Sequence, residues 1–157
     1  MMNIFLAVPY SAACGLNGAG SFHERVSELI RHFEQRGFSV YAAPREESWG
    51  RDRPTRERGI VRDIAALAAA SVFVAMFGGY YADGVLVEIG MALSMRKRVI
   101  LLRAANEGWP KYLDGLVAAG LAEAKEYVSE ADLALVVPMP CAQGPRNKEH
   151  RGESVVS

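Results

Sequence analysis

One acidic residue stands out because of the segments around it. Glu88 lies within residues 85–95, which are apolar at helical spacing, and a glycine- and tyrosine-rich stretch, residues 78–84, comes directly before them. An acid near the start of a helix is common, because the helix dipole favours negative charge there. A surface helix does not need a glycine-rich aromatic turn before it, whereas a small-molecule pocket does. We therefore treat Glu88 as a candidate catalytic carboxylate.

Two more acidic residues are candidates for chemistry near Glu88. Asp63 lies among apolar residues in segment 59–70, which has helical periodicity. It is either a dipole partner in the first turn of that helix or a second carboxylate of a pocket. Asp83 directly precedes Gly84, just before the segment that carries Glu88. A nearby acid can give a proton or a hydrogen bond to a leaving group.

A charged stretch, residues 44–59, carries five arginines and four acids around one tryptophan, Trp49. Its simplest interpretation is a solvated loop. Arg45, Glu47 and Trp49, however, come just after a predicted strand, where an arginine can bind a phosphate or a carboxylate. All three are therefore candidate substrate-binding residues.

A second candidate loop, residues 11–20, is small and glycine-rich. It contains neither the G-x-G-x-x-G pattern nor a Walker lysine, so a flexible connection and a phosphate-binding loop both stay open. Ser11 at its start is a candidate phosphate ligand. Gly79, in the turn that precedes Glu88, is a further candidate for close approach of a ligand.

Alternating strands and helices must position these candidates. Apolar runs predict strands at residues 3–10, 38–43, 71–77 and 98–102, with a weak strand at 124–128. Helical patterns fall between and after them, at residues 21–37, 59–70, 85–95, from Pro110 onward, and at 129–137. Ser21, with Glu24 three residues later, has the pattern of a capping box.

This alternation predicts one α/β domain, with a five-stranded parallel sheet, helices on both faces and a flavodoxin-like or Rossmann-like strand order. The domain is expected to span residues 1–138, and the polar segment 139–157 is expected to be a disordered tail. Ligands bind such sheets where the carboxyl ends of strands meet helix N-termini. Glu88, Asp63 and segment 44–59 are therefore expected at one edge.

The composition argues against several classes of function. The chain has 157 residues, with 18 basic and 18 acidic side chains, so bulk charge gives no argument for nucleic-acid binding. No apolar run reaches the roughly 18 residues of a membrane span, and no signal peptide is recognisable. Cys14 and Cys141 show no metal-ligand spacing. We expect a cytoplasmic protein that binds neither a metal nor a membrane.

Several stretches together resemble the nucleoside 2-deoxyribosyltransferase superfamily. They are the first strand running into Pro9-Tyr10, segment 32–50, the helix bearing Asp63 before strand 71–77, and segment 83–102. The likeness covers about residues 3–117, and its most specific element is Gly-x-x-x-Glu-Ile-Gly at 84–90. The sequence is most similar to the hydrolytic branch, the cytidylate N-glycosidases of nucleoside-antibiotic pathways, through the Arg-Glu-Glu-Ser-Trp-Gly loop and the Val-Phe-Val-Ala strand.

The resemblance implies roles for individual residues. It makes Glu88 the carboxylate that attacks C1′ of the ribose or holds the attacking water, and it places Asp63 near that nucleophile. Phe5 and Tyr10 match the aromatic pair that lines the sugar and base. Transferases of this family usually carry an Asp two residues before the glycine, where Ala82 stands here. That departure argues against transfer to an acceptor base.

A second departure concerns the residue after Tyr10. Hydrolytic relatives can carry an arginine at this position, where Ser11 stands here, so the base or its modification can differ. A 5′-phosphate would require arginine or serine donors and a helix N-terminus. Arg45 is the first candidate for that contact, followed by Ser11 and the backbone of Gly84.

These observations predict an N-glycosidase that cleaves a nucleoside 5′-monophosphate, with a pyrimidine nucleotide such as CMP favoured, to free base and ribose 5-phosphate. No metal or redox cofactor is needed for that reaction. A nucleoside 2-deoxyribosyltransferase that exchanges bases is the first alternative. A non-catalytic nucleotide-binding module, in which Glu88 only bonds ribose hydroxyls, is the second.

The resemblance also implies a homodimer or a higher closed oligomer, in which a neighbouring subunit helps to close the pocket. Trp109 and Tyr112 are the residues expected to reach a partner's pocket. Two apolar helix faces support an interface independently. Their residues are Met91, Ala92 and Met95 on one helix, and Leu113, Leu116 and Val117 on another. The alternative is that both faces pack within one subunit.

Overall fold

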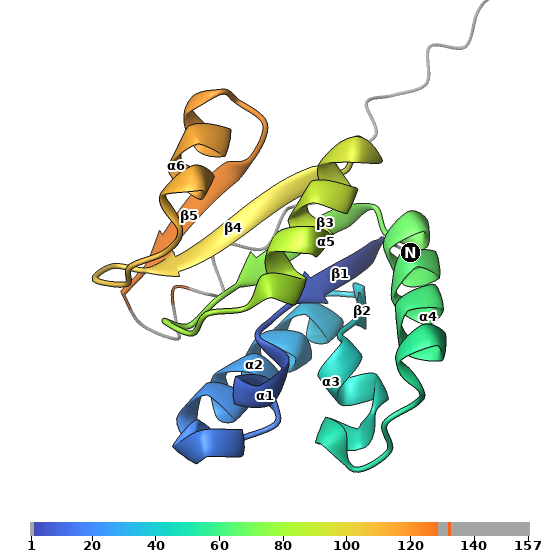
Figure 1. Cartoon of the computed structure of the whole chain (residues 1–157). Helices are drawn as coiled ribbons and strands as arrows, with labels where there is room; N and C mark the ends of the chain where they lie inside the picture. Colours follow the sequence, from blue (N-terminus) through green and yellow to red (C-terminus); the bar gives the residue numbers. More distant parts are fainter. Residues whose placement is uncertain (1, 129–131, 133–157) are drawn as a thin grey trace, which may run out of the picture.

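The fold is a five-stranded, all-parallel sheet (Figure 1), as the sequence predicts. The computed structural model describes residues 2–128 and residue 132. The strand order is β2-β1-β3-β4-β5, which is the flavodoxin-like order. The strands are β1 Asn3–Ala7, β2 Ser39–Tyr41, β3 Val72–Met76, β4 Arg98–Ala104 and β5 Glu123–Tyr127.

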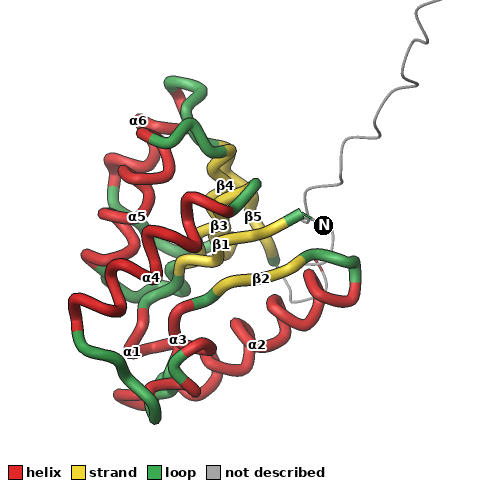
Figure 2. The backbone as a smooth tube through the Cα atoms, turned by 90° about the vertical axis from the view of Figure 1, so that its right-hand side faces the viewer, coloured by secondary structure: helices red, strands yellow, loops and turns green. Residues whose placement is uncertain are grey.

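Helices cover both faces of the sheet, which also confirms the expectation (Figure 2). The helical segments are α1 Tyr10–Ala13, η1 Leu16–Gly18, α2 Gly20–Gln35, α3 Ala43–Glu46, η2 Ser48–Gly50, α4 Arg56–Ala69, α5 Asp83–Ser94 and α6 Lys111–Ala118. Helix α2 packs on one face, and α4, α5 and α6 pack on the other. No helix in the described part is long and apolar enough to span a bilayer.

Burial on both faces explains the continuous apolar strands. Every residue of β3 is buried, as parallel strands between two helical layers require. Because side chains alternate along a strand, Ile4 and Leu6 of β1 pack toward α2, and Phe5 and Ala7 pack toward α4 and α5. Phe5 thereby ends on the face of the sheet that carries Glu88.

Three helix starts differ from the prediction, those of α2, α4 and α5. Helix α2 begins at Gly20 after Ala19, with no side-chain cap, so the capping box at Ser21 is wrong. Helix α4 begins at Arg56, because the Thr55 hydroxyl accepts the backbone N–H of Arg58 and caps the helix earlier.

Helix α5 begins at Asp83, two residues before the predicted start, and the earlier starts of α4 and α5 change the positions of both key acids. Asp63 is the eighth residue of α4, so it is not a first-turn acid. Glu88 is the sixth residue of α5, and Asp83 is the acid in the first turn of that helix. The helix dipole therefore does not account for either Asp63 or Glu88, and the pocket interpretation of Asp63 is the one that remains.

Both candidate loops contain ordered turns rather than open chain. Residues 11–20 form the end of α1 and the short helix η1, and residues 43–50 form α3 and η2. The turn after β3 requires glycine: Gly78 has a φ of 64°, and an added Cβ would lie 2.1 Å from the ring of Phe22. The backbone of the turn before α5 therefore packs closely on Phe22 of α2. The predicted helix 129–137 and tail 139–157 lie outside the described residues, except for residue 132.

Candidate active site

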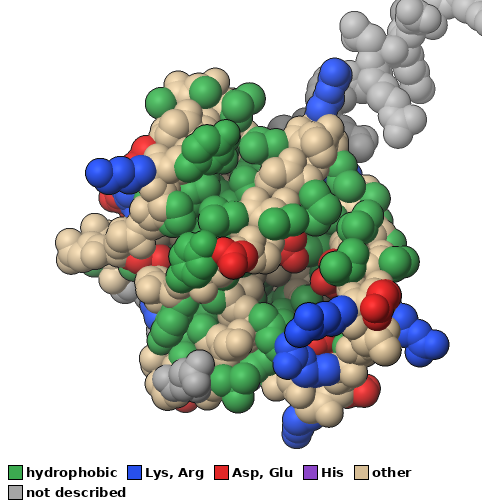
Figure 3. Space-filling model, viewed as in Figure 1, with side chains coloured by type: hydrophobic (Ala, Val, Ile, Leu, Met, Phe, Trp, Pro, Cys, Tyr) green, Lys and Arg blue, Asp and Glu red, His purple; other side chains and the backbone are tan. Residues whose placement is uncertain are grey.

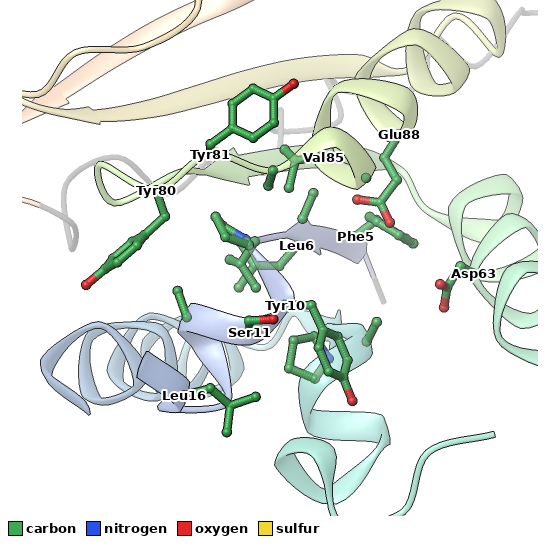
Figure 4. A pocket seen from close by; sticks show the side chains of 18 residues that line it. Phe5, Leu6, Tyr10, Ser11, Leu16, Asp63, Tyr80, Tyr81, Val85 and Glu88 are labelled. Carbon is green, nitrogen blue, oxygen red and sulfur yellow. The ribbon is translucent and has the colours of Figure 1, made fainter. Parts of the chain in front are cut away.

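A cavity of about 460 Å³ lies where β1 and β3 end and α5 begins. This is the carboxyl edge of the sheet, where ligands of such folds bind. Side chains from both helical layers and the strand ends enclose it (Figure 4). Its lining residues are Phe5, Leu6, Ala7, Val8, Pro9, Tyr10, Ser11, Ala12, Leu16, Ala43, Pro44, Asp63, Tyr80, Tyr81, Ala82, Gly84, Val85 and Glu88.

Aromatic rings form much of the wall. Phe5, at one side of the cavity, stacks on Tyr41 at 5.2 Å and on Phe73 at 5.7 Å between ring centroids. Tyr10 and Tyr80 also line the cavity. Flat rings of this kind suit the faces of a sugar and a base, and the few polar groups among them can fix a ligand's orientation.

Glu88 and Asp63 point into the same side of the cavity, next to Phe5 (Figure 4). Glu88 comes from the second turn of α5 and Asp63 from α4. Loss of hydration, together with a smaller contribution from the charge of Asp63, raises the pKa of Glu88 to about 8. No residue in the described part donates a hydrogen bond to Glu88, so nothing there offsets its lost hydration.

Asp63 has the opposite surroundings. The Tyr41 hydroxyl donates a hydrogen bond to Asp63 Oδ1, and Nη2 of Arg62 lies 3.3 Å from the same oxygen. Burial and the bond to Asp63 raise the pKa of the Tyr41 hydroxyl well above its usual range, so Tyr41 stays a donor. Asp63 is thus held in place by two donors on one of its oxygens.

A third acid, Glu47, supports the wall from behind. Its side chain is buried, with 7% of the residue exposed, and it accepts a hydrogen bond from the Tyr10 hydroxyl. Arg62 pairs with its other oxygen at 2.6 Å. Glu47 therefore fixes the ring of Tyr10 rather than entering the cavity.

Comparisons with known proteins agree with this geometry at the level of the fold. No family model and no curated protein sequence matches the chain. Solved structures do. The structure of Clostridium botulinum CMP N-glycosidase, BcmB, is similar with a TM-score of 0.65 and 23% identity, over 85% of this chain and 94% of that one. The chain has the nucleoside 2-deoxyribosyltransferase-like fold.

Two further structures share this fold. The solution structure of BlsM is similar with a TM-score of 0.65 and 28% identity, over 85% of each chain. A 2-deoxyribosyltransferase from Bacillus psychrosaccharolyticus is similar with a TM-score of 0.61 and 18% identity, over 84% of this chain and 90% of that one. The matches confirm the resemblance found in the sequence and the fold that it implies.

The deoxyribosyltransferase-like fold brings together six of the predicted site residues. The six that line the cavity are Phe5, Tyr10, Ser11, Asp63, Gly84 and Glu88. Gly84 lies in the first turn of α5, where free backbone N–H groups favour an anion, and Ser11 lines the cavity from α1. Among the described residues, no group of three or more potential ligands could hold a metal ion.

Arg45 and Trp49 do not line the cavity. The Arg45 guanidinium pairs with Glu34 of α2 and donates to the Val40 carbonyl, so the structure does not bring it to a phosphate in the cavity. Trp49 packs edge-on against His23, with 4.3 Å between ring centroids. Both residues tie the segment after β2 to α2.

Gly79 and Asp83 lie beside the cavity rather than in its lining. The Gly79 N–H donates to Glu107 Oε1 at 2.8 Å, which anchors the turn to the loop after β4. Asp83, the first residue of α5, accepts a hydrogen bond from Tyr81, which raises the pKa of that tyrosine. Asp63 is therefore better placed than Asp83 to meet a ligand.

The two residues expected to reach a partner lie near α6, away from the cavity lining. Trp109 donates from its indole N–H to Asp114 at 2.8 Å, and Arg103 lies over its ring. Tyr112 is 78% exposed. The apolar faces predicted for an interface pack inside the subunit, because Ala92, Leu113 and Leu116 are buried in the core between the sheet and α4–α6.

The sequence analysis missed four residues of the site. Tyr41 and Arg62 hold Asp63, and Tyr80 and Tyr81 line the cavity. The two turn tyrosines carried a signal, because they lie in the glycine-rich turn before Glu88. Tyr41 and Arg62 carried none, since their role depends on β2 and α4 meeting in space.

Proposed function

We propose that this protein is an N-glycosidase that hydrolyses the bond between base and ribose of a nucleoside 5′-monophosphate, with a pyrimidine nucleotide such as CMP favoured. The observation that carries the proposal is the partly buried Glu88 carboxylate, without a hydrogen-bond donor among the described residues, facing an aromatic cavity beside Asp63. Similarity of fold to a CMP N-glycosidase supports the reaction class.

The proposed chemistry follows from these positions. The bond between C1′ and the base nitrogen breaks with its electron pair going to the base, and the sugar becomes an oxocarbenium-like centre. Glu88 stabilises that centre as a nucleophile that bonds C1′ or as a base that holds the attacking water. The oxygen of water ends on C1′, and its proton balances the charge of the leaving base. Asp63 is placed to accept a hydrogen bond from the base and to pass on to it the proton that the water gives up.

The phosphate of such a substrate would bind at the start of α5. Gly84 lines the cavity there, where the positive end of the helix dipole favours an anion, and Ser11 adds a hydroxyl from α1 to the same cavity. Binding of the phosphate, which is remote from the reacting bond, can lower the barrier to breaking that bond. The nucleotide is therefore expected to be cleaved far faster than its nucleoside.

A panel of nucleotides and nucleosides tests the proposal, with products separated by chromatography. Free base plus ribose 5-phosphate supports the hydrolase. Exchanged bases, in the presence of an added acceptor base, would instead establish the transferase alternative, which similarity of fold to a deoxyribosyltransferase favours. Binding without turnover would leave a nucleotide-binding module. Equal rates on nucleotide and nucleoside would overturn the monophosphate preference.

We also propose that the active form is a homodimer or a higher closed oligomer. Exposed apolar side chains lie on α4 and α5, on both sides of a hollow with acidic side chains (Figure 3). They are Ile60, Val61 and Ile64 of α4 and Val87 of α5. Exposed apolar surface around a site is typical of an interface. A fully active monomer at micromolar concentration, shown by light scattering, would contradict this proposal.

A further inference from the structure

One arginine behind the cavity joins side chains from three segments. Arg62 of α4 donates to Glu47 Oε1 and to the Tyr41 hydroxyl, each at 2.6 Å, and lies 3.3 Å from Asp63 Oδ1. Tyr10 donates to the other oxygen of Glu47, and Tyr41 donates to Asp63. The five side chains therefore form one continuous chain of hydrogen bonds from Tyr10 to Asp63.

Glu47 makes this arginine necessary. A carboxylate as buried as Glu47 has lost most of its hydration and must be paired. Arg62 is the only cation that pairs with it among the residues that the structure describes. Burial disfavours the charged guanidinium, but the bonds to Glu47 and Tyr41 outweigh it and raise the pKa of Arg62. Arg62 thus stays charged at any working pH.

Only the two ends of the hydrogen-bonded chain reach the cavity. Tyr10 and Asp63 line it, whereas Arg62, Glu47 and Tyr41 do not. Asp63 accepts both of its bonds at Oδ1, so its other oxygen is left for the cavity. The forked guanidinium thereby sets the rotation of the Asp63 carboxylate and, through Glu47, the tilt of the Tyr10 ring.

We propose that Arg62 is a positioning residue, which acts on the substrate only through Asp63 and Tyr10. The inference rests on the proposed function, because it assigns a role at the same site. It differs from a structural role of Arg62, in which the guanidinium would do no more than neutralise the buried Glu47.

Four variants separate the two roles. R62M removes the charge and the fork, and R62K keeps the charge without the fork. The double variant E47Q/R62M removes both members of the buried pair. Arg58→Met is the matched control, because Arg58 is an exposed arginine one turn earlier on the same helix.

A positioning role predicts that the variants change Tm and kcat to different degrees. R62M is expected to lower Tm and to lower kcat at least tenfold, because Glu47 is left unpaired and Asp63 loses its fork. E47Q/R62M should regain most of the lost Tm and still turn over at least tenfold more slowly than wild type. R62K should regain Tm more fully than kcat, and R58M should match wild type in both. Recovery of kcat by the double variant to within threefold of wild type would overturn the inference.

Carbon-13 NMR of tyrosines labelled at Cζ decides the question without turnover. The resonances of Tyr10 and Tyr41 are expected to move in R62K and R62M and to stay unchanged in R58M, since Arg62 holds both hydroxyls directly or through Glu47. If wild type cleaves no nucleotide or nucleoside, the proposed function fails while moved resonances still uphold the positioning by Arg62. If the resonances stay in place, the positioning role is wrong even where hydrolysis is observed.

Discussion

The two walls of the cavity present the same chemical group in opposite surroundings. On α5, Glu88 is partly buried and receives no hydrogen bond from the described residues, and the loss of hydration raises its pKa to about 8. On α4, Asp63 is held by Tyr41 and Arg62. Hydrogen bonds to a carboxylate favour its charged form, and burial without them disfavours it. The acid on α4 is therefore held by donors, and the acid on α5 is not.

Under the proposed function, this difference gives the two acids different roles. A carboxylate that is poorly solvated gains most when positive charge develops next to it, as at C1′ of a departing nucleoside. A carboxylate that already has donors changes little and is suited to orienting the base. The fold supplies the contrast, because α5 enters the cavity with apolar neighbours and α4 meets the polar residues that follow β2.

The same isosteric change on each wall gives the largest expected effect. Glu88→Gln should lower kcat by about a thousandfold or more, because it removes the charge that stabilises the oxocarbenium centre. Asp63→Asn keeps a group that can bond the base and should cost about ten- to a hundredfold. Glu24→Gln, at an exposed position of α2, is the control. Turnover by E88Q within tenfold of wild type would exclude Glu88 as the catalytic carboxylate.

The pH dependence of turnover tests the raised pKa of Glu88 directly. The carboxylate form is the active one, so kcat/KM should rise about tenfold per pH unit below pH 8 and level off above it. D63N removes the nearby charge, and its acidic limb should move to lower pH. Measured profiles with a limb near pH 4.5 would show that Glu88 is well solvated in the free protein.

A smaller effect concerns stability. The folded protein holds the Glu88 proton more tightly than the unfolded chain does. The free energy of unfolding therefore decreases as pH rises from 4.5 to about 8, because Glu88 loses that proton. E88Q has no such loss. It should match wild type near pH 4 and exceed it above pH 8 by a few kcal/mol, on the order expected for a buried carboxylate. Urea unfolding at both pH values measures the difference, and an equal stability at pH 8.5 would contradict it.

The strands and their order could be predicted because their signals are local. Residues 71–77 are apolar throughout, as a strand buried on both faces must be, and alternation with helices then gives the sheet order. The first residues of the helices were harder to predict. The cap of α4 depends on one hydroxyl at Thr55, and α2 begins without any side-chain cap.

Within the site, the sequence predicted the residues that bear reactive groups and missed those that hold them. Glu88 and Phe5 could be found from strand ends, glycine turns and a family resemblance. Arg45 was a reasonable phosphate ligand from its place after β2, yet its guanidinium bonds Glu34 of α2. A side chain as long as arginine can reach either face of a strand end, and only the packed structure decides which.

The smallest expected effect comes from removing one hydrogen bond to Asp63 while keeping its carboxyl group. Tyr41→Phe removes the hydroxyl that donates to Asp63 Oδ1 and accepts from Arg62, and it keeps the contacts of Arg62 with Glu47 and Asp63. We expect a two- to fivefold loss in kcat and a loss of about 2 kcal/mol in the free energy of unfolding, which is typical of two hydrogen bonds. Tyr112→Phe, at a side chain that is 78% exposed, is the control and should change neither. A loss as large as that of D63N would mean that Tyr41, and not Arg62, orients the carboxylate. A variant identical to wild type would mean that the arginine fork holds Asp63 alone.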